Sequence, residues 1–241
     1  MTCSSPFAFA ALIVDTEAYL TRELGLEPLA LPIGLGRAEG EWRGSSATIE
    51  TRAYRGGVIR YARFAVVRAA DLDIGNILCL PAPEHPLPIL GADLVALGRE
   101  TGMLAADLSP VLPAGAECAA QLAPLAARRA RQPPLPPGGR LPAWCAAWFS
   151  PHALYTRVDA AGLGNAVAAF QEFPRAFVAL ALRSRPRPAL AREIVYAQDG
   201  YAAAHRTDDK GLRLLATMFG TAWAERYLRE VLFPPDEALS C

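Results

Sequence analysis

The sequence predicts an α+β fold, in which helices pack against a mostly antiparallel sheet. Residues 47–108 form a succession of short β-prone runs with partial alternation of apolar and polar residues. The links between these runs are too short for the crossover connections that parallel strands need, so we expect antiparallel pairing. After Pro113 the pattern becomes helical. Strands followed by helices, rather than alternating with them, are typical of this fold class.

The composition favours one compact protein without a nucleic-acid or membrane partner. With 241 residues, 52% of them hydrophobic, we expect residues 1–241 to form a single domain with a sizeable core. The 24 basic and 24 acidic residues cancel, which is not the charge excess of a nucleic-acid-binding protein. No stretch approaches the roughly 18 continuous apolar residues of a membrane span, so a cytoplasmic location is expected.

The expected elements follow one another in a simple order along the chain. A helix is predicted for residues 7–24, and a turn-rich passage through Pro32, Gly34, Gly36 and Gly40 follows it. We expect strands at residues 47–54, 61–69, 74–81, 89–97 and 103–108. Helices are predicted at residues 116–131, 160–182 and 189–230, the last broken near residues 208–210. The proline-rich residues 131–142 are interpreted as a surface loop.

Local motifs give no indication of a metal site or a tightly bound cofactor. The glycines between Gly34 and Gly40 lack both the spacing and the preceding strand of a dinucleotide-binding loop. The cysteines are widely spaced without a CxxC pair, which argues against a disulfide framework or a structural zinc site. The histidines stand far apart and none belongs to an HxxxH arrangement: His85, His152 and His205.

Two aspartates attract attention, and the local sequence leaves two interpretations open for each. Asp107 ends an apolar strand-like run, where burial would raise its pKa toward a range useful for proton transfer. The alternative, which the local sequence favours, is that Asp107 caps the turn made by Ser109 and Pro110. Asp208 interrupts a helical pattern, where an N-cap of the following helix is the simpler interpretation.

Read together, several motifs resemble the ferredoxin-dependent bilin reductases, which convert biliverdin IXα into phytobilins. The motifs are GNILCLPAPEHPLPILGADLVAL at residues 75–97, AADLSPVL at residues 105–112 and FGTAWAERYLREVLF at residues 219–233. The resemblance covers roughly residues 49–233 in the same order. It implies a three-layer α/β/α sandwich with a central antiparallel sheet, and a bilin bound between the sheet and the C-terminal helices.

The resemblance also implies functions for individual residues. Asp107 matches the family's central sheet aspartate and is expected to donate a proton early, and Asp208 is expected to serve reduction of the A ring. Asn76 and Leu78 stand where phycocyanobilin enzymes have histidine and glutamate, which argues against a simple phycocyanobilin assignment. Arg157 and Lys210 are candidates for binding the two propionates, and the alternative for each is a solvated surface charge. The full set of expected substrate-binding residues is Asn76, Leu90, Ser109, Arg157, Lys210 and Leu214.

The expected chemistry uses one-electron steps without a resident cofactor. Electrons would come from a reduced [2Fe–2S] ferredoxin, the bilin itself would carry the radical intermediates, and a positioned acid would supply each proton. Because ferredoxins are acidic, the docking face should be locally basic. Two arginine clusters are candidates for docking, or alternatively only solubilise helix ends: Arg128, Arg129 and Arg131, and Arg183, Arg185 and Arg187. A monomer is expected.

The sequence leaves alternatives open for the bilin that is formed and for the class of protein. The bilin formed would be of the phycoerythrobilin or phycocyanobilin type, and a phytochrome or phycobiliprotein would receive it. Partial reduction to a dihydrobiliverdin is an alternative within the family. A bilin-binding carrier without catalysis is an alternative of a different class, although such a carrier does not need acids at Asp107 and Asp208. An NADPH-dependent biliverdin reductase would require a nucleotide-binding βαβ unit, for which the sequence gives no pattern.

Overall fold

The computed structural model describes residues 7–98, 100–143, 145–207 and 210–235 and has the expected α+β fold. Its centre is an antiparallel sheet with the order β1-β3-β4-β5-β6-β7-β8, while β2 pairs with β3 beyond this path. The strands are β1 (Glu27–Leu29), β2 (Arg37–Trp42), β3 (Ser45–Gly56), β4 (Ile59–Ala69), β5 (Leu72–Pro81), β6 (Ile89–Leu97), β7 (Gly102–Ser109) and β8 (Leu154–Val158).

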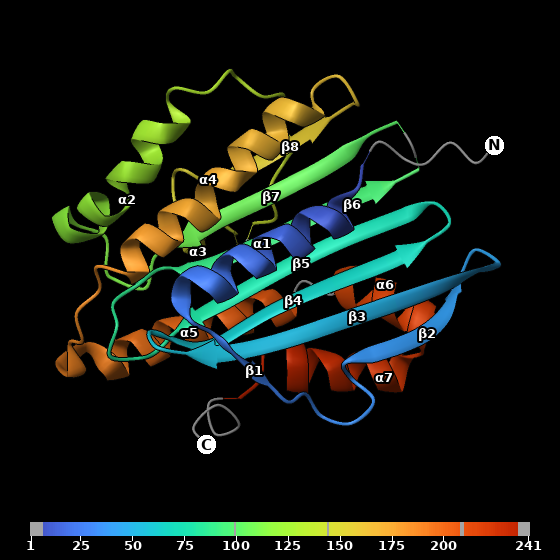
Figure 1. Cartoon of the computed structure of the whole chain (residues 1–241), viewed down its shortest axis with the longest axis horizontal. Coiled ribbons are helices and arrows are strands. Elements are labelled where there is room, and N and C mark those ends of the chain that lie inside the picture. Colours follow the sequence, from blue (N-terminus) through green and yellow to red (C-terminus); the bar gives the residue numbers. More distant parts are fainter. Residues whose placement is uncertain (1–6, 99, 144, 208–209, 236–241) are drawn as a thin grey trace.

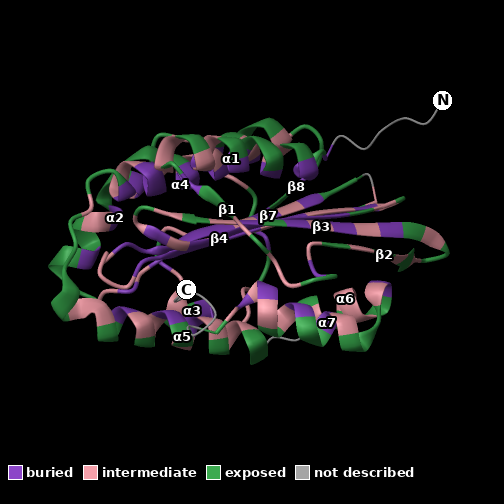
Figure 2. Ribbon diagram, turned by 60° about the horizontal axis from the view of Figure 1, so that its bottom comes forward, coloured by how far each residue is buried: buried purple, intermediate pink, exposed green. Residues whose placement is uncertain are grey.

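Helices cover both faces of the sheet, as Figure 2 shows with the sheet nearly edge-on. One layer contains α1 (Phe9–Leu24), α2 (Ala116–Arg129) and α4 (Leu163–Ala181). The other layer contains α5 (Ala191–Thr207), α6 (Lys210–Phe219) and α7 (Thr221–Tyr227), and α7 continues into a π-helical turn at Leu228–Leu232. The short helix α3 (Cys145–Trp148) and a 3-10 turn at Pro188–Leu190 complete the elements. The molecule is therefore an α/β/α sandwich.

Side-chain alternation along each strand decides which helical layer a residue meets. Phe64, Ile77 and Leu104 lie on the face beneath α1 and α4, where they pack with Phe170 and Phe177 in the largest core cluster. The residues between them point to the other face and toward the C-terminal helices. Smaller apolar clusters there leave part of the second interface open, so this interface can hold a cavity.

The structure confirms the five predicted strands and the predicted helices, and it adds three strands that sequence patterns did not indicate. Gly40 lies in β2 and not in a turn. The strand β2 was not predicted because half of its residues in RAEGEW are charged, and edge strands tolerate such residues. The expected long C-terminal helix is interrupted a second time at Gly220, whose positive φ of 87° separates α6 from α7.

No helix within the described ranges has the length and apolar character needed to cross a bilayer.

Candidate functional site

A cavity of about 400 Å³ lies between the sheet and the C-terminal helices. Its floor is the sheet face opposite α1 and α4, formed by residues of β4 to β8. Its other wall comes from α5, α6 and the π-helical turn, with Tyr201, Leu214 and Leu228 among the lining residues. The lining is mainly apolar, so the few polar groups on the floor would determine how a ligand is oriented.

The strand register places the floor residues in rows that run across the sheet. The cross-strand pairs Arg63–Leu78, Leu78–Gly91 and Gly91–Asp107 form one row. Directly paired residues share a face, so all four point into the cavity that they line. A neighbouring row contains Asn76, Asp93, Ala105 and Tyr155. The charged groups of the floor are thus at the two ends of the first row, Arg63 and Asp107, and in the neighbouring pair Asn76–Asp93 of the second row, where Asp93 carries the carboxyl group.

Asp107 is held at one end of the first row by three hydrogen bonds from two serines. Only 2% of the residue is exposed. The Ser109 hydroxyl donates to Oδ2 at 2.8 Å, and the Ser150 backbone N–H donates to the same oxygen at 2.8 Å. The Ser150 hydroxyl donates to Oδ1 at 2.5 Å. The carboxyl group is therefore fixed in orientation while its strand places it against the cavity.

Burial and hydrogen bonding act on this carboxyl group in opposite directions. Desolvation raises the pKa of Asp107, and the donors from Ser150 and Ser109 lower it, with a net value of about 6. Near neutral pH the group can consequently take up and release a proton without a large free-energy cost. Asp107 is thus suited to general acid catalysis. Its carboxyl group also accepts a hydrogen bond from the Ser109 hydroxyl, so it contacts the last residue of β7 as well as Ser150.

Aromatic side chains from the helical layer cover Asp107 and its row. The Tyr201 hydroxyl lies so close to Gly91 that a Cβ there would be 2.6 Å away, which explains why glycine occupies this position. The Tyr201 ring lies 4.3 Å from the His205 ring, and the His205 ring lies 5.2 Å from that of Phe233. All three line the cavity. Burial raises the pKa of Tyr201, so its hydroxyl remains protonated and can donate a hydrogen bond.

A second polar group on the floor connects three strands. The Arg63 guanidinium donates from Nη2 to Asn76 Oδ1, and the Asn76 amide donates to Asp93 Oδ1. Arg63 is 1% exposed, so this is a fully buried arginine. Burial raises the pKa of Asp93, while the Asn76 hydrogen bond and the charge of Arg63 lower it. Asn76 therefore faces the cavity, as expected, but in an orientation fixed by both neighbours.

The structure brings together some of the residues expected from the sequence. Asn76, Asp107 and Leu214 line the cavity. Ser109 contributes indirectly, by holding Asp107. Arg157 is exposed on β8, paired with the cavity residue Met103, and so lies at the sheet edge beside the cavity.

Other expected residues are not found at the cavity. Leu90 is 1% exposed in the core beneath α1 and α4, because its position in β6 points it to the face opposite the cavity. Asp208 and the side chain of Lys210 lie outside the described residues. Arg63, Asp93 and Tyr201 were not predicted as site residues, since a polar residue in a strand or helix carries no local signal of the face on which it lies.

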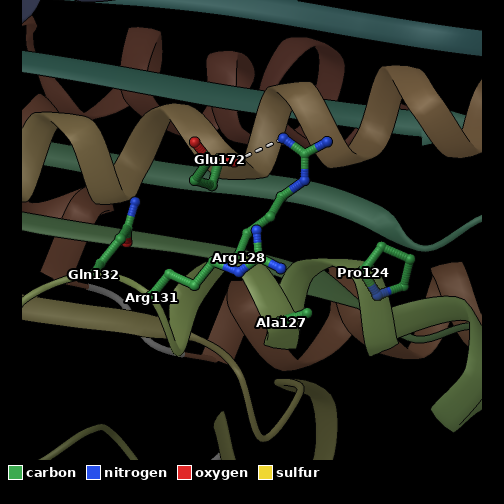
Figure 3. Close-up of a pocket in the computed structure, with 6 residues that line it drawn as sticks. All are labelled: Pro124, Ala127, Arg128, Arg131, Gln132 and Glu172. Atoms are coloured by element: carbon green, nitrogen blue, oxygen red, sulfur yellow. Dashed lines mark hydrogen bonds and ion pairs between the residues drawn. The ribbon is translucent and has the colours of Figure 1, made fainter.

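Arg128 of α2 and Arg131, just after α2, line a groove between α2 and α4, on the far side of the sheet from the cavity (Figure 3). Arg128 reaches across this groove to Glu172 of α4, with a distance of 3.0 Å between Nη1 and Oε2. The guanidinium of Arg129 lies 5.7 Å above the ring of Phe173. Two members of this arginine cluster thus connect α2 to α4, a structural role that neither the docking nor the solubilising interpretation included.

Metal ligation has no candidate in the described ranges, where no three His, Cys, Asp or Glu residues lie close enough to share an ion.

Comparison with known proteins identifies the family over almost the whole chain. The family described as ferredoxin-dependent bilin reductase matches residues 15–234. The phycocyanobilin:ferredoxin oxidoreductase of Gloeobacter violaceus is 34% identical over 216 residues, which cover 87% of this chain and 83% of that protein. The phycoerythrobilin:ferredoxin oxidoreductase of the same organism is 30% identical over 243 residues, covering 97% and 96%.

A solved structure supports the fold. The crystal structure of phytochromobilin synthase from tomato, in complex with biliverdin, has a TM-score of 0.85 and covers 97% of this chain and 85% of its own. Its sequence identity is 18%, so this likeness concerns the fold. With a family match over residues 15–234 and relatives at 30% identity or more, the chain belongs to the ferredoxin-dependent bilin reductases and is an oxidoreductase.

Proposed function

We propose that this protein reduces biliverdin IXα to a phytobilin of the phycoerythrobilin or phycocyanobilin type. Electrons come one at a time from a reduced [2Fe–2S] ferredoxin, and Asp107 supplies protons. The observation that carries the proposal is the buried Asp107 carboxyl group, with a pKa of about 6, on the floor of a mainly apolar cavity. The names of the two curated relatives and the biliverdin bound by the tomato enzyme support the choice of substrate.

The geometry suits a reaction in which electrons and protons arrive separately. The tetrapyrrole lies in the cavity between the sheet and the C-terminal helices, which exclude water from its rings. Each added electron raises the basicity of the conjugated system, so an acid with a pKa near the working pH can protonate it. Ser109 and Ser150 fix the direction of the Asp107 carboxyl group throughout and favour its return to the ionised form.

Further residues complete the proposed site. Asp208, between α5 and α6, is the second proton donor and serves the A ring. Arg157, at the sheet edge, and Lys210, at the start of α6, bind the propionates at the cavity mouth. Leu78 is apolar where phycocyanobilin enzymes are expected to carry glutamate, which favours the phycoerythrobilin type.

The proposal is tested by anaerobic turnover of biliverdin with ferredoxin and a reducing system. Asp107→Asn should lower the rate about 100-fold or more, as expected for loss of a general acid, while the variant still binds biliverdin. Asp208→Asn should stop the reaction before the A ring is reduced. Exposed Asp15→Asn, on the far side of the sheet, is the matched control and should behave as wild type. If Asp107→Asn and Asp208→Asn both keep the wild-type rate and product, the assignment is wrong.

The same assay separates the alternatives. An absorbance change that requires ferredoxin identifies a reductase, and chromatography of the pigment distinguishes phycoerythrobilin, phycocyanobilin and a dihydrobiliverdin. A static spectral shift on mixing, without turnover, identifies a carrier. Turnover with NADPH alone, without ferredoxin, would contradict the proposed electron donor.

A further inference from the structure

Arg63 is the least expected residue of the cavity floor. It lies in the middle of β4 with 1% of its surface exposed, the largest fully buried side chain among the described residues. Its Nη2 donates to Asn76, but its Nε and Nη1 are buried and have no hydrogen-bond partner in the described part of the chain. A buried cation with two unused donors is costly unless another group supplies acceptors.

The position of Arg63 indicates where such an acceptor would be. Arg63 and Asp107 stand at opposite ends of the row that continues through Leu78 and Gly91. With strands about 4.8 Å apart, three strand spacings separate the two residues by about 14 Å. Since both line the cavity, a ligand spread over this row meets a proton donor at one end and a fixed cation at the other.

Asn76 and Asp93 hold the guanidinium in place. The chain of hydrogen bonds from Arg63 through Asn76 to Asp93 connects β4, β5 and β6, so the cation cannot turn away without breaking it. Asp93 places a carboxyl group one amide away from the cation. The site therefore needs an oxygen acceptor rather than another negative charge.

We propose that Arg63 is a substrate-binding residue that donates hydrogen bonds to a lactam carbonyl oxygen of the linear tetrapyrrole. This inference rests on the proposed function. A linear tetrapyrrole has a lactam carbonyl on each terminal ring and its propionates on the two inner rings. The closed floor at Arg63 suits the neutral carbonyl, because an ionised carboxylate would lose its hydration there. The propionates remain at the sheet edge, where Arg157 is exposed.

The first experiment measures the Kd of biliverdin by anaerobic absorbance titration. Arg63→Met keeps the length of the side chain and removes its donors, and should raise Kd about ten-fold or more, the loss expected for hydrogen bonds from a charged group. Arg68→Met, at an exposed position of the same strand, is the matched control and should leave Kd unchanged. Arg63→Lys keeps the charge but loses the planar fork, so it should give an intermediate Kd.

The spectrum distinguishes contact with the pigment from support of the fold. A guanidinium on the lactam oxygen alters the absorption of the conjugated system, so the absorption maximum of bound biliverdin should shift in Arg63→Met and return toward wild type in Arg63→Lys. Should Arg63→Met fail to fold, the Arg63→Lys titration and spectrum carry the test. A wild-type spectrum together with a wild-type Kd in the folded variant would overturn the inference.

A second arm separates the lactam oxygen from a propionate. Biliverdin dimethyl ester keeps both lactams but lacks the propionate charges. If Arg63 binds a lactam, the ratio of Kd between Arg63→Met and wild type should be the same for the ester and the free acid. A ratio that falls to about one with the ester would assign Arg63 to a propionate and overturn the inference. If the wild-type protein turns over biliverdin but Arg63→Met changes neither its Kd nor its bound spectrum, the proposed function stands and only the role of Arg63 is rejected.

Discussion

At the scale of single residues, Asp107 shows how position can change the chemistry of an ordinary carboxyl group. Three hydrogen bonds from Ser109 and Ser150 favour its ionised form, but burial outweighs them and leaves the pKa at about 6. A carboxyl group without these donors would have a still higher pKa and would lose its proton less readily. The serines therefore adjust the acid as well as orient it.

The raised pKa predicts a pH-dependent stability. In an unfolded chain an aspartate has a pKa of about 4, so the folded protein binds this proton more tightly and its free energy of unfolding falls as pH rises from about 4 to about 6. The loss is of order 2–3 kcal/mol and levels off above pH 6. Asp107→Asn removes this effect, so its stability relative to wild type should improve by that amount from pH 4 to pH 8.

Thermal or urea unfolding at both pH values measures this difference. Because the amide introduced by Asp107→Asn does not titrate, its hydrogen bonds contribute equally at both pH values, so the change of the gap with pH reports the titration of Asp107 in the wild type. A gap that stays constant from pH 4 to pH 8 would contradict the raised pKa of Asp107.

At the scale of elements, the C-terminal helices are placed by close contacts with the sheet that define the cavity. The helix α6, which carries the cavity residue Leu214, rests on the edge strand β2. At Gly40 a Cβ would lie 2.0 Å from the carbonyl oxygen of Met218, so only glycine permits this approach. The strand β2, which no sequence pattern indicated, thus fixes the position of α6 against the sheet.

Gly40→Ala should accordingly move α6 or destabilise the protein. Because the neighbouring atom belongs to the backbone, the overlap should cost about 1–3 kcal/mol and lower Tm by roughly 3–10 °C. Biliverdin affinity should fall with it, since Leu214 moves with α6. The control is Gly164→Ala in α4, where no atom lies within 4 Å of the added Cβ and Tm should be unchanged or slightly higher. Equal Tm values for the two variants would show that β2 and α6 do not pack this closely.

At the scale of the whole molecule, the sandwich separates two interfaces with different functions. The interface with α1 and α4 is filled by a continuous apolar core, and the interface with α5 and α6 contains the cavity. The net charge is zero, so attraction of an acidic ferredoxin depends on how the charges are distributed. Arg128 lies on the filled side and is already paired with Glu172, which makes it a poor candidate for docking near the cavity.

Ferredoxin docking should therefore depend on salt without depending on Arg128. The kcat/KM for ferredoxin should fall several-fold between about 50 mM and 300 mM salt, because screening weakens attraction between exposed charges. Arg128→Ala should follow the wild-type curve, and the Kd of biliverdin serves as the control for effects of salt on the cavity. A rate that does not respond to salt would count against electrostatic docking, and a flat curve for Arg128→Ala alone would show that the α2 side takes part.

The fold class, five strands and the main helices could be predicted from the sequence, because alternation, helical periodicity and turn residues are local signals. The family could be predicted from the resemblance of its motifs. The motif around Asp107 also singled out the carboxyl group that lies on the cavity floor and that we propose as the proton donor. The face that each strand residue occupies could not be predicted in this way, since it depends on pairing between distant segments and a shift of one position reverses it. Leu90 therefore lies in the core beneath α1 and α4, while its neighbour Gly91 lies under Tyr201 in the cavity. For the same reason Arg63, within an unremarkable apolar run, became part of the site only when β4, β5 and β6 were aligned.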